Sequence, residues 1–546
     1  MKWEVLSKNK VKDQKEIIDI LLRNRKIFSK RDQEEFFEPK NPEEISLKSL
    51  GIDSLEVKKA ITRIKEAIKT QEKVFVYGDY DADGVCATAI MWETLFSIGL
   101  NVLPYIPERF SEGYGLNIES IKKLKKENDD LGLIVTVDHG IVADKKLDTT
   151  KELGIDVIIS DHHQPGKIKP KSFALIHTTQ ISGSGVSYFF AREILKAIKV
   201  TKKLDRESLE LAAIGTIADQ LPVVGPNRSV IKFGLSSLNK TKRVGLISLL
   251  ENAGTRLGQI GTYEVGFMIA PRINAMGRLG HAIESLRLIC TKDKLKAKEL
   301  SGLLTKTNTE RQKIVEEVVI HARKNVTSQK IIVLSHTSYH EGVIGLAAGR
   351  IVEEFYRPAV VISTQGKIAK ASARSVSGFN IIEVIRSLDK LIIEGGGHPM
   401  AAGFSINKSS IKKFESEINK IAEKKLTDDL LVKKMKIDLE IDFKFINMNL
   451  LNSLRKFDPT GYGNSAPVFL TKAVNLEDAR RIGKESRHLK LKVEKDGKYF
   501  SAIAFGMGGV YKQLSPDKKF DIAYQIQEDG WSGGNAIQLI VKDILI

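Results

Sequence analysis

The chain has 546 residues, 42% of them hydrophobic and 28% charged, with a formal net charge of +18. This length exceeds one ordinary hydrophobic core, so we expect a globular protein of two to four domains. The N-terminus lacks the apolar core of a signal peptide and no run approaches the ~20 apolar residues of a membrane span, so we expect a cytoplasmic protein. Cys86 and Cys290 are too few for a disulfide framework or a zinc site. The surplus of positive charge favours a polyanionic partner such as nucleic acid, although a lysine-rich composition alone also produces it.

Residues 1–50 are highly charged with scattered apolar positions, and we expect a short helical extension there. Residues 51–230 contain short runs rich in Val and Ile, separated by helical patterns. The expected strands are 74–78, 101–106, 133–138, 156–160 and 173–177, and the expected helices between them are 84–99 and 117–128. A further helix over 207–220 ends beside Asp219. Strand, helix and strand at this spacing predict βαβ units and an α/β domain with a parallel sheet.

The rest of the chain divides into three parts. Residues 231–328 show helical patterns with charged faces, which predict a helical connector. A second α/β pattern occupies 329–430 and includes the glycine-rich segment 394–406. From 431 to 546 the pattern is all-β, with strict alternation at 488–493. Several short strands in about 110 residues predict a small barrel or sandwich.

Acidic and histidine side chains follow the strands of the first expected sheet. They are Asp79, Asp81, Asp83, Asp138, His139, Asp161, His162 and His163, and Asp219 closes the last expected helix. Because the carboxyl ends of parallel strands meet at one edge of a sheet, we expect these groups to lie together. Carboxylates with one or two imidazoles match Mg²⁺ or Mn²⁺ rather than zinc, and the histidine favours Mn²⁺. Two such ions about 3.5–4 Å apart serve phosphoryl chemistry, with a water between them as the nucleophile.

Each piece of this pattern also has an ordinary structural interpretation. The three aspartates from Asp79 to Asp83 suit a turn or a calcium loop, and Asp138-His139-Gly140 suits a helix cap. Asp219 suits a helix end. Their occurrence in order within one βαβ series favours the metal site over these separate interpretations.

The same segments resemble a known family. The DHH phosphoesterases have four ordered motifs to which this chain is similar at GDYDADG (78–84), TVDHG (136–140), SDHH (160–163) and IADQLP (217–222). GGGHPMAAG (395–403) resembles the signature of the DHH-associated domain. Three further segments are similar to the RecJ exonucleases within this superfamily: PERFSEGYG (107–115), IAPRINAMGRLGHA (269–282) and EGVIGLAAGR (341–350). The resemblance covers roughly residues 50–545. It implies a DHH domain, a helical connector, a DHH-associated domain and a C-terminal OB fold.

The resemblance implies particular metal ligands. These are Asp81, Asp83, Asp138, His162 and Asp219, with Asp138 bridging two ions. Asp79 is then either a further ligand or a residue that supports the ligands. His163 is expected to contact the scissile phosphate or to support His162. The implied activity is processive 5′→3′ hydrolysis of single-stranded DNA to 5′-mononucleotides, in recombination and repair.

Basic and glycine-rich residues are candidates for gripping the strand. Guanidinium groups bind phosphate bidentately, so we expect Arg109, Arg278 and Arg374 with Ser372 to hold a 5′-phosphate and the backbone. Each arginine, taken singly, also suits an ordinary surface ion pair. Three glycines, Gly395, Gly396 and Gly397, let backbone N–H groups approach a phosphate, and His398 adds a donor.

Two further features concern contacts with bases and backbone. Tyr114 is a candidate for stacking on a base, although a loop aromatic also suits packing. Lys490 and Lys492 share one face of a strand in the expected OB fold, which suits a single-strand track as well as an ordinary solvated face.

The chain departs from the family pattern in three places. Ile176-His177-Thr178 stands where an Asn-Pro pair is usual, and Ala371-Ser372-Ala373-Arg374-Ser375 replaces a Gly-Ser-x-Arg-Ser run. The segment 456–469 replaces a linker that usually begins Pro-Phe-Gly. These departures bear on the grip of the strand, and none removes an expected metal ligand.

Two other functions compete with this interpretation. One is a DHH phosphoesterase that cuts nanoRNA or cyclic dinucleotides, and the other is a non-catalytic scaffold that binds single-stranded DNA. The resemblance implies single-stranded DNA as partner, with a helicase and a single-strand binding protein as further partners, and we expect a monomer without membrane contact. We also expect the two α/β domains to form a cleft too narrow for duplex DNA.

Overall fold

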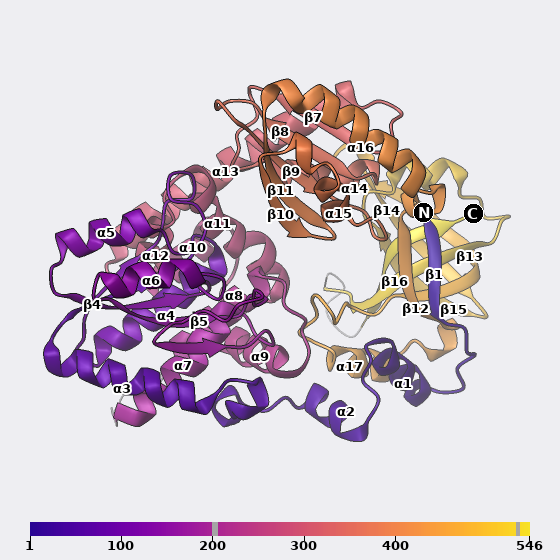
Figure 1. Ribbon diagram of the computed structural model, residues 1–546. Coiled ribbons are helices and arrows are strands. Elements are labelled where there is room, and N and C mark those ends of the chain that lie inside the picture. Colours follow the sequence, from indigo (N-terminus) through magenta and orange to yellow (C-terminus); the bar gives the residue numbers. More distant parts are fainter. Residues whose placement is uncertain (199–205, 531–535) are drawn as a thin grey trace.

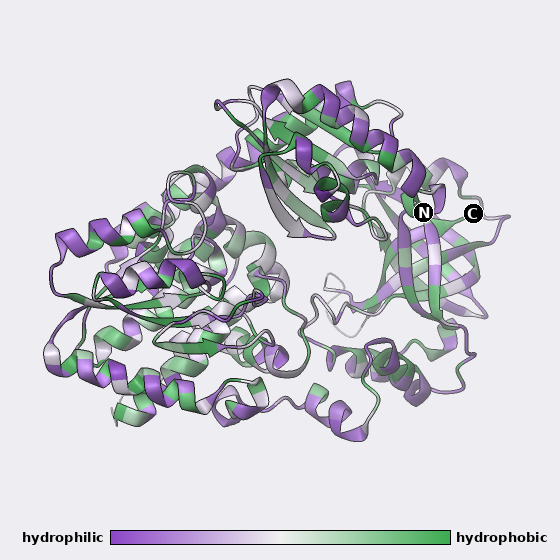
Figure 2. Cartoon of the chain, in the orientation of Figure 1, coloured by the Kyte–Doolittle hydropathy of each residue, from purple (hydrophilic) through white to green (hydrophobic). Residues whose placement is uncertain are grey.

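The computed structural model describes residues 1–198, 206–530 and 536–546, which form three lobes around a central opening (Figure 1). The first lobe contains a parallel sheet, the second a mixed sheet and the third a closed barrel. Both chain termini lie in the third lobe (Figure 1). In each lobe the apolar strands lie inside and the charged helix faces lie outside, as Figure 2 shows. Among the described residues, no helix has the length and apolar character needed to cross a membrane.

The sheet of the first lobe has the strand order β3-β2-β4-β5-β6, and every neighbouring pair is parallel. Its strands are β2 (Lys73–Tyr77), β3 (Asn101–Tyr105), β4 (Leu131–Val137), β5 (Asp156–Asp161) and β6 (Ala174–His177). All five expected strands are therefore present, each within two residues of its predicted ends. The strands read as nearly continuous apolar runs because both faces of a parallel sheet are covered by helices.

Helices cover the two faces of this sheet unequally. One face packs with α3 (Ser54–Thr70), α4 (Ala82–Ser97) and α7 (Gly183–Ile198) in the largest hydrophobic core. The other face packs with α5 (Ile118–Glu127) and α6 (Asp144–Glu152) in a smaller core.

The segment that we expected to be a connector mostly belongs to the first lobe. Its helices are α8 (Arg206–Ala218), α9 (Gly225–Leu238), α10 (Val244–Asn252), the π-helix η3 (Glu264–Ile269), α11 (Ala270–Leu279), α12 (Ile283–Cys290) and α13 (Lys294–Asn325). Apolar side chains from α8 to α12 share the core of α4 and α7. Of these helices, α13 runs from the first lobe to the second, because its first half joins that core and its last turns pack on the second lobe. The domain boundaries themselves stay a prediction.

The second lobe has a five-stranded sheet in the order β10-β11-β9-β8-β7. Its elements are β7 (Ile332–His336), α14 (Ile344–Phe355), β8 (Ala359–Ser363), β9 (Ala369–Arg374), α15 (Ile381–Arg386), β10 (Glu394–His398), β11 (Ala401–Ile406) and α16 (Ile411–Lys425). Only β7 and β8 are parallel, and the other pairs are antiparallel. The edge strands β10 and β11 point toward the central opening (Figure 1).

The third lobe is a five-stranded barrel that closes because β16 pairs with β13. Its elements are β12 (Lys434–Glu440), α17 (Met448–Arg455), β13 (Phe469–Ile482), β14 (His488–Lys495), β15 (Lys498–Ala504), β16 (Phe520–Glu528) and β17 (Ile537–Leu545). The closed order β13-β14-β15-β17-β16 agrees with the expected OB fold, and closure removes the unpaired edges of the sheet.

The N-terminal residues belong to this third lobe, which corrects our expectation of a helical extension. The strand β1 (Lys2–Ser7) pairs in parallel with β12 at the edge of the sheet. The helix α1 (Gln14–Asn24) buries Ile17 and Leu21 in the barrel core, and α2 (Lys30–Phe37) adds Phe36. The pairing was not predictable because the strand and its partner lie at opposite ends of the chain.

The third lobe is fixed to the first through Arg228 of α9, whose side chain is fully buried. Its guanidinium donates hydrogen bonds of 2.6–3.0 Å to five backbone carbonyls, those of Phe36, Lys456, Phe457, Asp458 and Pro459. Thr460, in the linker segment 456–469, also contacts the first lobe, because the hydroxyl of Thr262 donates a 2.6 Å hydrogen bond to its carbonyl. The unusual linker therefore serves as the joint between lobes.

Candidate metal centre

The polar residues named from the sequence meet beyond the carboxyl ends of β2, β4 and β5. In the strand order β3-β2-β4-β5-β6, the connections after β2 and β4 run to opposite sides of the sheet. This is the topological switch point at which open α/β sheets bind their ligands. The fold therefore places these residues at its natural binding site.

The first three aspartates lie in the turn from β2 into α4. Asp81 caps α4, and its carboxylate accepts hydrogen bonds from the backbone N–H groups of Asp83 (2.9 Å) and Gly84 (3.0 Å). Asp79 is buried, and its Oδ1 has no hydrogen-bond partner among the described residues. Asp83 accepts from the N–H groups of Gly183 (2.7 Å) and Ser184, at the first turn of α7.

Asp138 follows β4 in a left-handed backbone conformation, with φ of 65°. Its carboxylate is buried, and its Oδ1 accepts no hydrogen bond within the described parts of the chain. Two glycines make room for the carboxylates. A Cβ on Gly183 would lie 2.2 Å from Oδ1 of Asp138, and a Cβ on Gly215 would lie 2.2 Å from Oδ1 of Asp83. The backbone is therefore shaped around these carboxylates.

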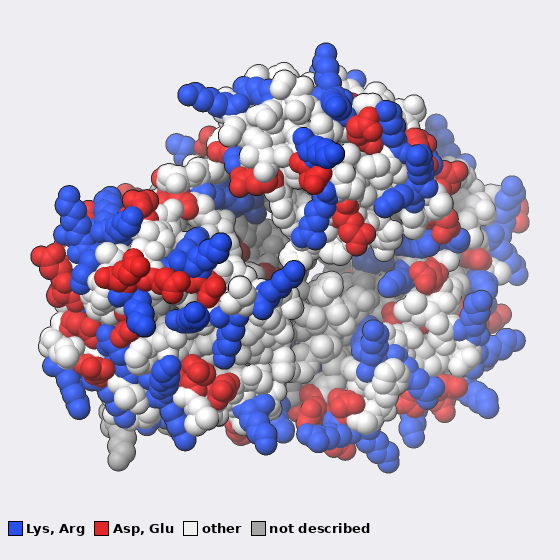
Figure 3. Space-filling view, viewed as in Figure 1, with Lys and Arg blue, Asp and Glu red and all other residues white. Residues whose placement is uncertain are grey.

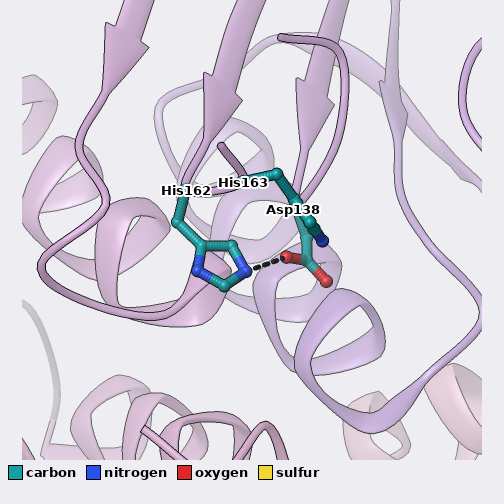
Figure 4. A group of neighbouring side chains, drawn as sticks. All are labelled: Asp138, His162 and His163. Atoms are coloured by element: carbon teal, nitrogen blue, oxygen red, sulfur yellow. Dashed lines mark ion pairs between the residues drawn. The ribbon is translucent and has the colours of Figure 1, made fainter. Parts of the chain in front are cut away.

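His162, after β5, faces the carboxylates with its Nε2 atom. That atom lies 3.2 Å from Oδ1 of Asp138, 3.6 Å from Oδ2 of Asp219 and 3.9 Å from Oδ2 of Asp83. Figure 4 shows the imidazole of His162 and the carboxylate of Asp138 facing one another beyond the strand ends.

These side chains form three overlapping groups. Within each group, the ligand atoms lie within 4.8 Å of one another. The groups are Asp79, Asp81 and Asp138; Asp138, His162 and His163; and Asp83, His162 and Asp219. All the residues that the resemblance implied as metal ligands are thus brought together. Asp138 and His162 each belong to two groups; of the two, a carboxylate has the two oxygen atoms that suit a bridging ligand.

Burial and mutual repulsion disfavour the charged forms of these carboxylates. Burial, followed by the charge of Asp81, raises the pKa of Asp79 to about 8. Burial and then Asp83 raise the pKa of Asp138 well above its usual range, and the same two causes raise that of Asp219. A fold with buried, unpartnered carboxylate oxygens fits divalent cations, because cations satisfy both the charge and the empty lone pairs.

Two further residues of the same motifs, His139 and Asp161, make hydrogen bonds within the protein and are not proposed as metal ligands. His139 is buried and its Nε2 lies 2.9 Å from the carbonyl of Tyr77, and burial lowers its pKa to about 4. Asp161 accepts hydrogen bonds from the N–H groups of Ile141 and His162 at 2.8 and 2.6 Å. Its Oδ1 also lies 2.8 Å from Nδ1 of His163. Burial opposes ionisation of Asp161, but these hydrogen bonds prevail and lower its pKa to about 2.

A row of aromatic and basic side chains borders the cluster. The guanidinium of Arg109 lies 4.9 Å above the ring of Tyr80, and the hydroxyl of Tyr114 lies 3.2 Å from Nε2 of His163. Tyr114 also donates to the carbonyl of Asp138 at 3.4 Å, and the residue is 45% exposed. Glu112 anchors this loop, because it accepts a 2.6 Å hydrogen bond from Tyr105.

The remaining predicted arginines form a second, positively charged part of the site. Arg278 lies in the last turn of α11 and donates to the carbonyl of Gly342 at 3.2 Å. Burial, and then the charges of Arg109 and Arg311, lower its pKa to about 10. Arg374 on β9 donates to Ser372 at 3.3 Å, and a Cβ on Gly345 would lie 3.2 Å from its guanidinium. Arginines that repel one another in a buried setting favour an anion between them.

The glycine-rich segment forms an edge strand of the sheet in the second lobe. Gly395, Gly396, Gly397 and His398 lie in the exposed edge strand β10, which pairs only with β11 in its sheet. A Cβ on Gly397 would lie 2.3 Å from the carbonyl of Ala401, whereas one on Gly396 would meet open space. The outer edge of β10 therefore offers backbone N–H groups from a strand.

Two residues of α11 brace the metal-site loop, and neither was predicted from the sequence. Asn274 accepts a 2.7 Å hydrogen bond from the N–H of Ala82, and a Cβ on Gly277 would lie 2.4 Å from the carbonyl of Tyr80. Both lie in the motif at 269–282, but no spacing rule connects that motif with a loop 192 residues earlier.

In the third lobe, Lys490 and Lys492 alternate with the buried Leu489 and Leu491 on β14, as predicted. The ammonium group of Lys492 lies 5.0 Å from the centre of the Tyr499 ring. A space-filling view shows the surface hollowed where the three lobes meet, with Lys and Arg side chains at its rim (Figure 3).

Comparisons with known proteins agree with this site and fold. Three family models match the chain: the DHH family, N-terminal domain, at residues 73–216; the DHHA1 domain at 328–424; and the RecJ OB domain at 437–543. The single-stranded-DNA-specific exonuclease RecJ of Bacillus subtilis is 35% identical over 505 residues, 90% of this chain and 63% of that protein. The protein of the same name from Thermus thermophilus is 32% identical over 89% of this chain and 71% of its own length.

A solved structure extends the likeness to three dimensions. The crystal structure of RecJ in complex with Mn²⁺ from Thermus thermophilus matches with a TM-score of 0.85 at 29% identity. The match covers 100% of this chain and 79% of that one. The chain thus spans less than two thirds of the length of the Bacillus relative and about four fifths of the Thermus structure. The chain belongs to the RecJ family.

Proposed function

We propose that this chain is a single-stranded-DNA-specific 5′→3′ exonuclease that hydrolyses phosphodiester bonds and releases 5′-mononucleotides, in DNA recombination and repair. The observation that carries the proposal is the gathering of Asp79, Asp81, Asp83, Asp138, His162 and Asp219 at the switch point of the sheet. The named activity of the Bacillus and Thermus relatives supports it.

The proposed cofactor is a pair of Mn²⁺ or Mg²⁺ ions. Asp79, Asp81 and Asp138 would hold one ion and Asp83, His162 and Asp219 the other, with Asp138 as the ligand that they would share; each trio has ligand atoms within 4.8 Å of one another. When bound, such ions lower the pKa of water and neutralise the charge of the phosphate. The bound Mn²⁺ of the Thermus structure supports this assignment.

The chain's own residues perform the other tasks of the reaction. Asp161 orients His163 through its 2.8 Å contact with Nδ1, which leaves Nε2 beside Tyr114 to donate to a phosphate oxygen. Although burial lowers the pKa of His163, the hydrogen bond and charge of Asp161 raise it overall, above its ordinary value. A protonated imidazole stabilises the charge that develops on the phosphate.

The strand end is held by the arginine pocket, hereafter the clamp, formed by Arg109, Arg278, Arg374 and Ser372. Guanidinium groups grip phosphate with two parallel hydrogen bonds, which suits a 5′-phosphate. Gly396, Gly397 and His398 on the edge strand β10 contact the backbone, and Tyr114 stacks on a base.

The three lobes account for the preference for single strands. In this proposal one strand enters the hollow at their meeting point (Figure 3), and Lys490 and Lys492 on the barrel guide that strand toward it. The partners of the chain in the cell include a helicase and a single-strand binding protein, the chain acts as a monomer, and its compartment is the cytoplasm.

A titration tests the proposed function directly. A 5′-labelled single-stranded oligodeoxynucleotide is incubated with the protein while Mn²⁺ is raised, and the products are separated by length. We expect release of labelled 5′-mononucleotide that depends on Mn²⁺ and on single-strandedness. Binding without cleavage would indicate a scaffold, and cleavage restricted to very short RNA or cyclic dinucleotides would indicate a smaller-substrate phosphoesterase. Either outcome would overturn the proposal.

A further inference from the structure

An exposed pair of aromatic rings lies on the helical segment that precedes α11. Tyr263 is 63% exposed and Phe267 is 66% exposed, and neither takes part in the site described above. Their ring centres are 4.8 Å apart with an angle of 27° between the ring planes, so the rings are stacked. Exposure of apolar rings of this size to water is unfavourable, so two such rings held together at the surface indicate a binding surface.

The backbone beneath this pair is a π-helix, η3, which continues without a break into α11. Such helices are rare and are found frequently at functional sites. Because Tyr263 and Phe267 are four residues apart, their side chains project from the same side of the helix.

The pair is close in the fold to the proposed metal ligand Asp219. η3 packs on α8, and a Cβ on Gly266 would lie 3.9 Å from the side chain of Ile217. Ile217 precedes Asp219 by two residues, and Gly266 is next to Phe267. The aromatic pair therefore lies beside the end of α8 from which Asp219 reaches the cluster.

The same helical segment reaches the clamp at its other end. Asn274 and Gly277 contact the loop of Asp79 and Asp81, and Arg278 belongs to the clamp. At a rise of 1.5 Å per residue, Phe267 lies about 16 Å along the helix from Arg278. The loop of Asp79 and Asp81 and the end of α8 that carries Asp219 therefore contact this helical segment at different points along its length.

A groove beside the pair gives a strand room to continue. It has a volume of about 470 Å³ and is lined by Lys232, Tyr263 and Thr460, among others. Thr262, the residue before Tyr263, donates its hydroxyl hydrogen bond to the carbonyl of Thr460, in the joint between the first and third lobes. The groove thus leads from the aromatic pair toward the lobe that carries the barrel.

We propose that Tyr263 and Phe267 form a stacking platform for the bases of the single-stranded DNA that trail the 5′ end. A strand held by its 5′-phosphate in the clamp passes the carboxylates and then meets the platform, where its bases stack on the two rings. Stacking accepts every base, because each has a π-face, and so suits a nuclease that degrades any sequence. This inference rests on the proposed function and adds to it the path of the uncut strand.

The test uses the full-length chain with Asp138→Ala, so that bound DNA is not cut. Oligodeoxynucleotides carry the fluorescent base 2-aminopurine at one position each, moved stepwise from the 5′ end. We expect quenching at a position a few nucleotides from the 5′ end, and its loss when Tyr263→Ala and Phe267→Ala are added. Affinity for single-stranded DNA is expected to fall about tenfold, because stacking on one base is worth about 1–3 kcal/mol.

Trp92 and Phe96 supply a matched control. They also form a stacked pair, with ring centres 5.7 Å apart and Phe96 63% exposed, but at the far end of α4 from the site. Phe96→Ala is expected to leave both quenching and affinity unchanged. Unchanged quenching in the Tyr263 and Phe267 variant, or equal losses in the Phe96 variant, would overturn the platform.

Cleavage separates failure of this inference from failure of the proposed function. If the platform is wrong but the function right, the Tyr263→Ala and Phe267→Ala chain with Asp138 intact keeps both wild-type affinity and wild-type Mn²⁺-dependent cleavage. If the proposed function is wrong, the unaltered chain itself fails to release mononucleotides from single-stranded DNA. RNA of the same sequence is tested in a second set of measurements. Stronger quenching of 2-aminopurine fluorescence in RNA than in DNA would contradict the assignment to DNA.

Discussion

The buried carboxylates of the metal centre and the buried guanidinium of Arg228 differ in the hydrogen bonds that the chain supplies to them. The carboxylates beyond β2 and β4 are crowded together, and the Oδ1 atoms of Asp79 and Asp138 have no hydrogen-bond partner among the described residues. Arg228, equally buried, donates to five backbone carbonyls at the joint between lobes. The N–H groups of the Arg228 guanidinium therefore have hydrogen-bond acceptors within the chain, whereas two carboxylate oxygens of the metal centre have no donor among the described residues.

This difference separates structure from function. A buried charge that the chain itself compensates contributes to the fold, whereas a buried charge without compensation within the chain costs stability until a ligand arrives. Removing the first kind of charge should therefore damage the fold, and removing the second kind should damage activity while sparing or improving the fold. Four substitutions or changes of condition test that contrast.

The largest expected effect is on activity. Asp138→Ala should reduce release of mononucleotides by at least about 10³-fold, because the metal ions stabilise the transition state by several kcal/mol. The metal-free variant should unfold at the same or a higher denaturant concentration than the unaltered chain, since it no longer buries a carboxyl oxygen that has no hydrogen-bond partner among the described residues. Retention of activity in Mn²⁺, or a clear loss of stability, would contradict the role of Asp138.

The converse substitution concerns Arg228. Arg228→Met should lower the free energy of unfolding by about 3 kcal/mol or more, because it leaves buried carbonyls without donors. Urea denaturation followed by tryptophan fluorescence measures this loss. Arg350→Met is the control, because Arg350 is exposed and pairs with Glu353 on its own helix. Equal stabilities for the two variants would show that the joint does not depend on Arg228.

A smaller effect on activity is expected at Asp161. This residue orients His163 but is not among the proposed ligands, so Asp161→Asn should lower kcat about 10- to 100-fold while KM changes little. The pH profile should shift as well, because the asparagine no longer raises the pKa of His163. Loss of cleavage as complete as in Asp138→Ala would instead place Asp161 among the ligands.

The smallest expected effect is on the pH dependence of stability without metal. The pKa of Asp79 is raised to about 8 in the folded chain, above its ordinary value near 4 in the unfolded chain. Between these values the folded state binds more protons, so its stability falls as the pH rises toward and through the folded pKa. In EDTA we expect a loss of about 2 kcal/mol between about pH 6 and pH 8.

Mn²⁺ should abolish or reverse this pH dependence, because the ions bind the deprotonated carboxylates. Melting temperatures with and without Mn²⁺ at the two pH values measure it, and Asp79→Asn should make the fall in EDTA shallower, with Asp219 still contributing through its own raised pKa. A melting temperature that rises with pH in EDTA would contradict the raised pKa of Asp79.

The sequence alone predicted those parts of the molecule that follow from local patterns and do not depend on contacts between residues far apart in the chain. The strands of the first sheet were predictable because both faces are buried and turn residues bound each run. The gathering of Asp79, Asp81, Asp83, Asp138 and His162 was predictable because these residues follow parallel strands, whose carboxyl ends must meet. Their roles as ligands, and the inclusion of Asp219 at the end of α8, came from the resemblance. His139 and Asp161 could not be assigned, since a turn motif does not show which of its polar side chains points back into the backbone.

Long-range contacts were beyond prediction. The pairing of β1 with β12, the brace from Asn274 and the five carbonyl partners of Arg228 each join segments far apart in the sequence. The alternation of charge and apolarity in residues 1–50 also suits a helix, so β1 could be found only through its partner. The sequence did not show that the glycine-rich segment forms an edge strand, because composition does not distinguish a turn from an exposed edge strand.

The most direct test of the account is to count bound ions. Isothermal titration calorimetry of the full chain with Mn²⁺, after removal of metal with EDTA, should give about two sites per chain, and Asp138→Ala should lose or severely weaken both. If the unaltered chain binds no Mn²⁺ with measurable affinity, or if Asp138→Ala binds it as the unaltered chain does, the crowded carboxylates do not form a two-ion centre.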